Sequence, residues 1–217
     1  MGIGRIAYYF DVESFRETIK PIINQLQIYD LSGLRKVAME IGSNNLSLWR
    51  LLGHFSFYPE YLGNEEKEFD TLENRIFFWT MIILSSFCQK VENPVNARVT
   101  DELLRSYGME EEVTKELCIG RPLGALLFPQ IEYKPALQRD DAEWPFWCQS
   151  YGGLGWLDKQ DVNRLLEVLT QNEKYLASKT IAIPPDAQQQ ISAYEALITM
   201  LNAASELGQG LFLGISV

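Results

Sequence analysis

Apolar residues recur three and four positions apart over most of this 217-residue chain, which is the spacing of a buried helix face. Possible N-caps at Asp11, Ser32 and Asp158 mark three of the expected starts. We expect Pro21 to kink or restart the first helix, because proline removes a backbone donor. We predict one helix after each of these caps and a long helix that ends before Gly208. Further helices are predicted over residues 44–53, 71–91, 99–108 and 109–120.

Both ends of the chain have strand composition instead. Residues 3–10 and 210–217 are rich in β-branched and aromatic side chains. Because a buried strand cannot leave its backbone groups unpaired, we expect both segments in one small sheet that helices cover. The predicted fold class is α+β, predominantly α-helical, in a single globular domain over residues 1–217. The pattern leaves the relative direction of the two strands open.

The periodicity is lost between Gly120 and Trp156, where prolines interrupt the chain and LGALLF is the one short strand or turn of helix expected. Irregular segments this long are uncommon in compact domains and are often functional. The segment ends in WPFWCQSYGGLGW, directly after a group of acidic residues. Tryptophan faces beside carboxylates are typical of carbohydrate sites. The candidate ligand-binding residues are therefore Asp140, Asp141, Glu143, Trp144, Trp147, Tyr151 and Trp156. The alternative is that a solvent-exposed turn precedes aromatic side chains that pack in the core, which explains the same pattern without a ligand.

The net charge of the chain limits the classes of partner that we expect. The formal net charge is −10, and Lys and Arg form no basic stripe, so neither nucleic acid nor an anionic membrane is an expected partner. Acidic residues gather in residues 60–73 and 101–116. Glu65, Glu66 and Glu68 are candidate contacts for a basic protein partner; the alternative is a solvated surface that maintains solubility.

Signatures of catalysis are missing from the sequence. It contains no phosphate-binding loop, nucleophile elbow or zinc spacing, and His54 is its single histidine. We therefore expect no metal and no cofactor, and we favour a non-catalytic protein over an enzyme, with His54 in a structural role at a helix end. Three cysteines without a paired spacing predict a reducing compartment, and no signal peptide or membrane span is expected, which together favour the cytoplasm.

The order of the segments resembles YfbM-like and related families of small bacterial proteins of unknown function. The matching pieces are IAYYFDVESF near the start and YEALITMLNAASELGQGLFLGIS near the end, with GRPLGALLFP and GLGWLDKQDVNRLLEVL between them. The resemblance implies a similar fold and a bacterial cytosolic location, and it transfers no site residue. The leading hypothesis is a non-catalytic protein that acts by binding, as an acidic interaction or immunity-type partner. The alternative is a small-molecule or carbohydrate-binding protein, or a cryptic enzyme, that uses residues 140–156.

Overall fold

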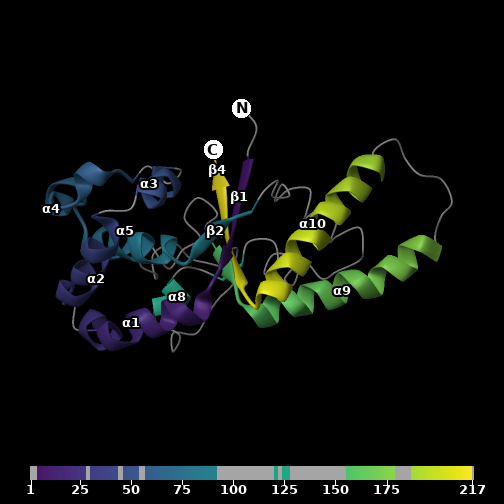
Figure 1. The fold of residues 1–217 in the computed structure, drawn as a ribbon, viewed down its shortest axis with the longest axis horizontal. Helices are drawn as coiled ribbons and strands as arrows, with labels where there is room; N and C mark the ends of the chain where they lie inside the picture. The colour runs from purple at the N-terminus through teal and green to yellow at the C-terminus, as the bar shows by residue number, and fades with distance from the viewer. Residues whose placement is uncertain are drawn as a thin grey trace.

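A four-stranded antiparallel sheet stands between two groups of helices (Figure 1). The computed structural model describes residues 4–27, 30–43, 46–53, 57–91, 120–121, 124–127, 155–178 and 187–216. Within these residues the strands are β1 (Gly4–Phe10), β2 (Cys88–Lys90), β3 (Gly155–Leu157) and β4 (Gly210–Ser216), in the order β2-β1-β4-β3.

The two terminal strands form the centre of this sheet. β1 and β4 pair along their full length, from Gly4 opposite Ser216 to Phe10 opposite Gly210. The predicted α+β class and the shared sheet are therefore confirmed. The structure adds the direction that the sequence left open, because the two strands run antiparallel.

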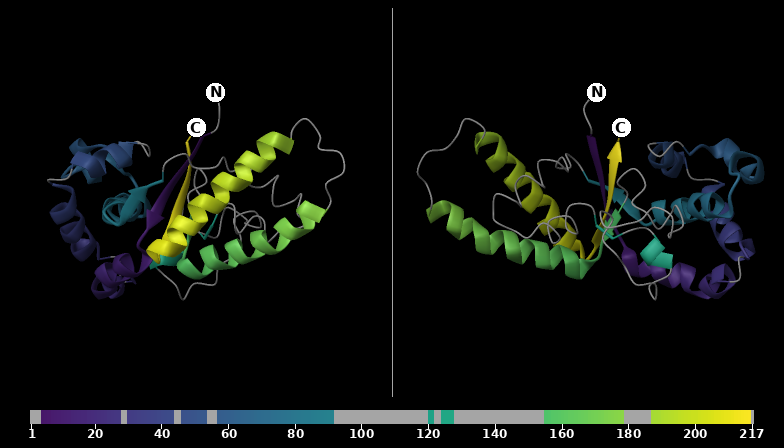
Figure 2. Two further views of the ribbon diagram at one scale, coloured as in Figure 1. Left: turned by 45° about the vertical axis from the view of Figure 1, so that its right-hand side comes forward. Right: turned by 180° about the vertical axis from the view of Figure 1, so that it is seen from behind.

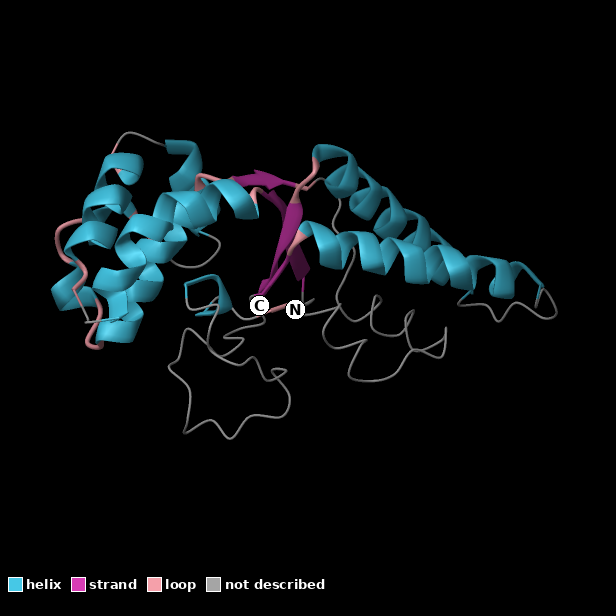
Figure 3. Ribbon diagram, turned by 90° about the horizontal axis from the view of Figure 1, so that it is seen from below, coloured by secondary structure: helices cyan, strands magenta, loops and turns pink. Residues whose placement is uncertain are grey.

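Helices cover both faces of the sheet (Figures 2 and 3). On one side lie α1 (Val12–Gln27), α2 (Ser32–Gly42), α3 (Leu46–Gly53), α4 (Glu65–Glu68), α5 (Leu72–Ser85) and the single turn α8 (Gly124–Leu127), with a 3-10 turn at Pro59–Tyr61. On the other side lie the two long helices α9 (Lys159–Ser178) and α10 (Ala187–Leu207). Within the described ranges, no helix combines the length and hydropathy needed to cross a membrane.

Alternation along the strands divides the core into two clusters. Tyr8, Phe10 and Phe212 pack with the N-terminal helices, whereas Leu211 and Leu213 pack with α9 and α10. Successive strand side chains point to opposite faces, so a sheet covered on both sides needs apolar residues at consecutive positions. The near-continuous apolar composition of the two terminal segments follows from this burial.

The central helix α5 is shorter than predicted. Thr71 caps it as expected, since its side chain accepts a hydrogen bond from the Asn74 amide at 3.2 Å. The helix ends at Ser85, however, and Cys88–Lys90 form the edge strand β2. These residues pair with the outer edge of β1 and therefore adopt a strand conformation. This pairing joins segments that are distant in sequence, so the local pattern of residues does not show it.

Several helix ends also differ from the prediction. Ser32 is the first residue of α2 and does not cap it; its amide donates to Asp30 Oδ1 at 2.9 Å. α1 continues through Pro21 without restarting. Gly155 and Trp156, predicted to end the irregular segment, form β3 with Leu157 against β4. The helices predicted over residues 99–108 and 109–120 fall outside the described residues, apart from Gly120.

Candidate functional site

A backbone bridge joins Arg121 to Trp156 across a long stretch of sequence. The Arg121 amide donates to the Trp156 carbonyl at 2.8 Å, and the Trp156 amide donates to the Arg121 carbonyl at 3.0 Å. The preceding residue, Gly120, has φ +79°, and a Cβ there would lie 2.7 Å from the Trp156 carbonyl oxygen. The close approach of the two backbones therefore requires glycine at position 120.

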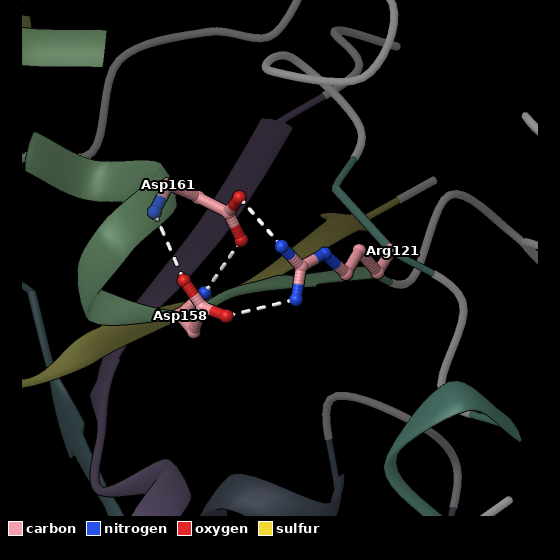
Figure 4. A network of polar contacts seen from close by, with 3 residues as sticks. All are labelled: Arg121, Asp158 and Asp161. Carbon is pink, nitrogen blue, oxygen red and sulfur yellow. Dashed lines mark hydrogen bonds and ion pairs between the residues drawn. The ribbon is translucent and has the colours of Figure 1, made fainter. Parts of the chain in front are cut away.

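The Arg121 side chain extends this bridge to the start of α9 (Figure 4). Its Nη1 lies 2.8 Å from Asp158 Oδ2, and its Nη2 lies 2.7 Å from Asp161 Oδ1. The two aspartates also cap the helix reciprocally: the Asp161 amide donates to Asp158 Oδ1 at 2.9 Å, and the Asp158 amide donates to Asp161 Oδ2 at 3.0 Å. The predicted cap at Asp158 is confirmed. We call Arg121, Asp158 and Asp161 the Arg121 clamp.

The two carboxylates of the Arg121 clamp differ in pKa. Burial raises the pKa of Asp158, but the hydrogen bond from the Asp161 amide and the Arg121 cation outweigh burial and leave the pKa below its usual value. For Asp161, burial is again the largest influence, and together with the charge of Asp158 it holds the pKa above its usual value. Asp161 is the more buried of the two, with 9% of its side chain exposed against 18% for Asp158.

Chemically, the Arg121 clamp has the properties of a structural connection. Each of its four carboxylate oxygens already accepts a hydrogen bond from the guanidinium or from a backbone amide. No oxygen is left without a donor to take up a metal ion or a substrate proton. In the described part of the chain, no group of three or more His, Cys, Asp or Glu side chains could hold a metal ion.

Trp156 is the one candidate ligand-binding residue within the described residues. Its side chain is buried, at 1% exposure, with the guanidinium carbons of Arg16 and Arg121 at 5.2 and 5.1 Å from the ring centroid. An indole in this position packs in the core and stacks on cations, and it offers no open face to a sugar. The other candidates, Asp140, Asp141, Glu143, Trp144, Trp147 and Tyr151, lie outside the described residues, as does His54.

The three acidic candidates occupy different environments. Glu65 is buried, at 4% exposure, and its Oε1 accepts from Arg35 Nε of α2 at 2.9 Å. Glu66 and Glu68 are exposed on the same helix turn. The carboxylate of Glu65 therefore joins α4 to α2, and only Glu66 and Glu68 are accessible to a partner.

An aromatic row runs from the core to the surface beside these carboxylates. It begins at the fully buried Phe78, whose ring lies 5.0 Å from Phe69; Phe69 lies 5.6 Å from Tyr61, and Tyr61 lies 5.6 Å from Tyr58. Tyr58 is 43% exposed, and Leu207 is the other large hydrophobic side chain with comparable exposure in the described part of the chain. We call residues 58–70 the acidic–aromatic segment.

The segment that contains the outer end of this row is rich in exposed negative charge. Four carboxylates of the acidic–aromatic segment are exposed, against one exposed lysine, Lys67. Burial raises the pKa of Tyr61 most, and the charges of Glu68, the Tyr58 phenol and Glu60 raise it further. The Tyr61 phenol therefore lies within electrostatic reach of Tyr58, Glu60 and Glu68. The exposed carboxylates are Glu60, Glu66, Glu68 and Asp70.

The sequence pattern indicated the acidic residues but not the tyrosines beside them, because the number of aromatic residues in a segment does not show which of them reach the surface. Arg121 was also missed, since 37 positions separate it from Asp158. The pair Asp158 and Asp161 has the spacing of a reciprocal helix cap, which was the available signal. Comparison with protein-family models, curated proteins and solved structures finds no match to this chain.

Proposed function

We propose that the protein is non-catalytic and acts by binding a basic protein through the acidic–aromatic segment. The observation that carries this proposal is the exposure of Tyr58 at the end of an aromatic row, in a segment that carries four exposed carboxylates. Tyrosine is enriched at protein interfaces, where its ring supplies contact area and its hydroxyl tolerates water.

The charge of the whole chain supports the same function. A net charge of −10 attracts a cationic partner over long distances, and the four exposed carboxylates concentrate that attraction on one segment. Such steering acts mainly on the association rate and weakens as salt is added, because exposed charges are screened beyond about 10 Å at 0.1 M salt. Binding by this segment should therefore be strongly dependent on ionic strength.

Charge reversal tests the proposal. The test variant is Glu66→Lys with Glu68→Lys, and the matched control is Glu195→Lys with Glu206→Lys, which alters two exposed residues of α10. Both double variants change the net charge equally. Glu65 is left unchanged, because a lysine there would be buried opposite Arg35 and would unfold the region rather than report on binding.

The measurement is a pull-down from lysate of the source cells over a series of salt concentrations, followed by the dissociation constant of the recovered protein. We expect the wild type and the α10 control to recover a basic protein, with less recovered as salt rises, and the test variant to lose it. Retention by the test variant, or equal loss by the control, would contradict the proposal.

A further inference from the structure

The outer end of the aromatic row has a defined geometry. The rings of Tyr58 and Tyr61 meet edge to face, with centroids 5.6 Å apart and an interplanar angle of 83°. Two rings at nearly a right angle form a corner, and a cation can contact the π-electron face of one while it approaches the other. We call this pair the tyrosine corner.

The tyrosine corner is held in place before any partner arrives. Tyr61 packs against Phe69 at 5.6 Å and against the buried Phe78 at 6.2 Å. The Tyr61 amide donates to the Tyr58 carbonyl at 3.1 Å, which fixes the two residues relative to each other through the 3-10 turn that Pro59 begins. A preformed site loses little conformational entropy on binding, so its contacts contribute more fully to affinity.

The charges beside the tyrosine corner select a cation. Glu60 and Glu68 act on Tyr61 electrostatically, and both are exposed. Lys67 is the single exposed cation within the acidic–aromatic segment. The combination of ring faces and exposed carboxylates matches a planar guanidinium, which stacks on aromatic faces and donates hydrogen bonds to carboxylates from its edge.

We infer that an arginine side chain of the partner binds at the tyrosine corner, stacked on the ring of Tyr58 beside Tyr61 and paired with Glu60 or Glu68. This inference rests on the proposed function and names the chemical group that the acidic–aromatic segment recognises. Lysine offers the same charge but a compact, strongly hydrated ammonium that cannot stack. Arginine should therefore be preferred over lysine at equal charge.

The test uses nona-arginine and nona-lysine peptides with the full-length chain, measured by fluorescence anisotropy. The variants are Tyr58→Ala, which removes the ring, and Tyr58→Phe, which keeps it. The double variant Glu66→Lys and Glu68→Lys tests the contribution of the negative charge of the acidic–aromatic segment. Tyr58 is 43% exposed, so both Tyr58 variants should fold, which circular dichroism checks. As a measurement on the unmutated chain, the ring proton resonances of Tyr58 are followed by NMR during titration with argininamide.

We expect nona-arginine to bind the wild type more tightly than nona-lysine. Tyr58→Ala should weaken nona-arginine about five- to thirtyfold and leave nona-lysine nearly unchanged, while Tyr58→Phe keeps most of the arginine affinity. Argininamide should shift the Tyr58 ring resonances.

If Tyr58→Ala binds nona-arginine as the wild type does, or the two peptides bind equally, the inference is overturned. The proposed function survives that result if the double charge variant still loses both peptides. It fails separately if the double charge variant binds both peptides as tightly as the α10 control.

Discussion

Replacing Arg121 with Met tests how the Arg121 clamp holds the chain together. Met keeps an apolar stem near Trp156 but removes the guanidinium from both carboxylates. Removing one partner of a buried ion pair costs roughly 3–5 kcal/mol, because the other charge stays buried without compensation. The Arg121 side chain is 29% exposed and Asp158 18% exposed, so water recovers part of this cost. We expect the free energy of unfolding to fall by about 2–3 kcal/mol.

Urea unfolding followed by circular dichroism measures this loss, and an unchanged m-value would show that the denatured state is the same. The amides of Arg121 and Trp156, which form the backbone bridge, should also exchange with solvent faster in the variant. As a control, Arg121→Met is introduced into a chain that already carries Asp158→Asn and Asp161→Asn. No unpaired charge remains there, so the added cost should be below about 1 kcal/mol.

A loss under about 0.5 kcal/mol in the wild-type background would refute this reasoning, since surface substitutions away from special contacts have effects of that size. So would an equal loss in both backgrounds, because the charges of Asp158 and Asp161 would then make no difference to the cost of removing Arg121.

Three further predictions concern the pair Asp158 and Asp161, Gly120, and Tyr8. Asp158→Asn should destabilise more at pH 7 than at pH 3, because the lowered pKa of Asp158 contributes stability above its usual 3.8 that is lost as the pH falls through the folded value. Asp161→Asn should destabilise more at pH 3 than at pH 7, because the stability from its raised pKa is present below 3.8 and is lost as the pH rises. Urea titrations of both variants at the two pH values check these signs. Gly120→Ala should lower the free energy of unfolding by about 2 kcal/mol more than Gly63→Ala in urea titrations; both glycines have φ +79°, but only at Gly120 would a Cβ meet backbone. Tyr8→Phe should stabilise by about 1 kcal/mol, since the buried hydroxyl has no hydrogen-bond partner among the described residues. Burial, with a smaller contribution from Cys88, raises the pKa of Tyr8 to about 12, so ionisation of Tyr8 should cost the wild type stability between pH 10 and pH 12. Tyr8→Phe should abolish this alkaline loss, as melting curves at these pH values would show.

Much of the helical framework was predictable because its signals are local. The caps at Asp11, Thr71 and Asp158 are each visible as a polar residue before an apolar stripe, and each accepts the expected hydrogen bond from a backbone amide. Gly208 follows the end of α10 as predicted. The terminal strands could be recognised from composition, whereas their direction depends on how the chain returns to β1.

The two short edge strands were not predictable for a physical reason. Cys88–Lys90 and Gly155–Leu157 have only three residues each, too few to show an alternating pattern. Their conformation comes from hydrogen bonds to β1 and β4, which are distant in sequence. The Arg121 clamp is hidden in the same way, because the guanidinium and its carboxylates meet only when the sheet has formed.

The candidate sites show a similar division. Acidic composition directed attention to Glu65, Glu66 and Glu68, but exposure is decided by tertiary packing. Glu65 is buried and pairs with Arg35, whose side chain is half exposed, and the exposed aromatic contact is Tyr58. A charge pattern can locate a segment, and the side chains within it that a partner touches are determined by the fold.

The most direct test of the proposed function is photo-crosslinking from position 58. A photoreactive phenylalanine analogue replaces Tyr58, and the same analogue replaces Leu207 in a matched control. Leu207 is also exposed and is the last residue of α10, which lies on the other side of the sheet. In lysate of the source cells, we predict that position 58 crosslinks to a basic protein, that added salt abolishes the product and that position 207 gives no such product. A salt-insensitive product, or equal crosslinking from both positions, would contradict binding by the acidic–aromatic segment.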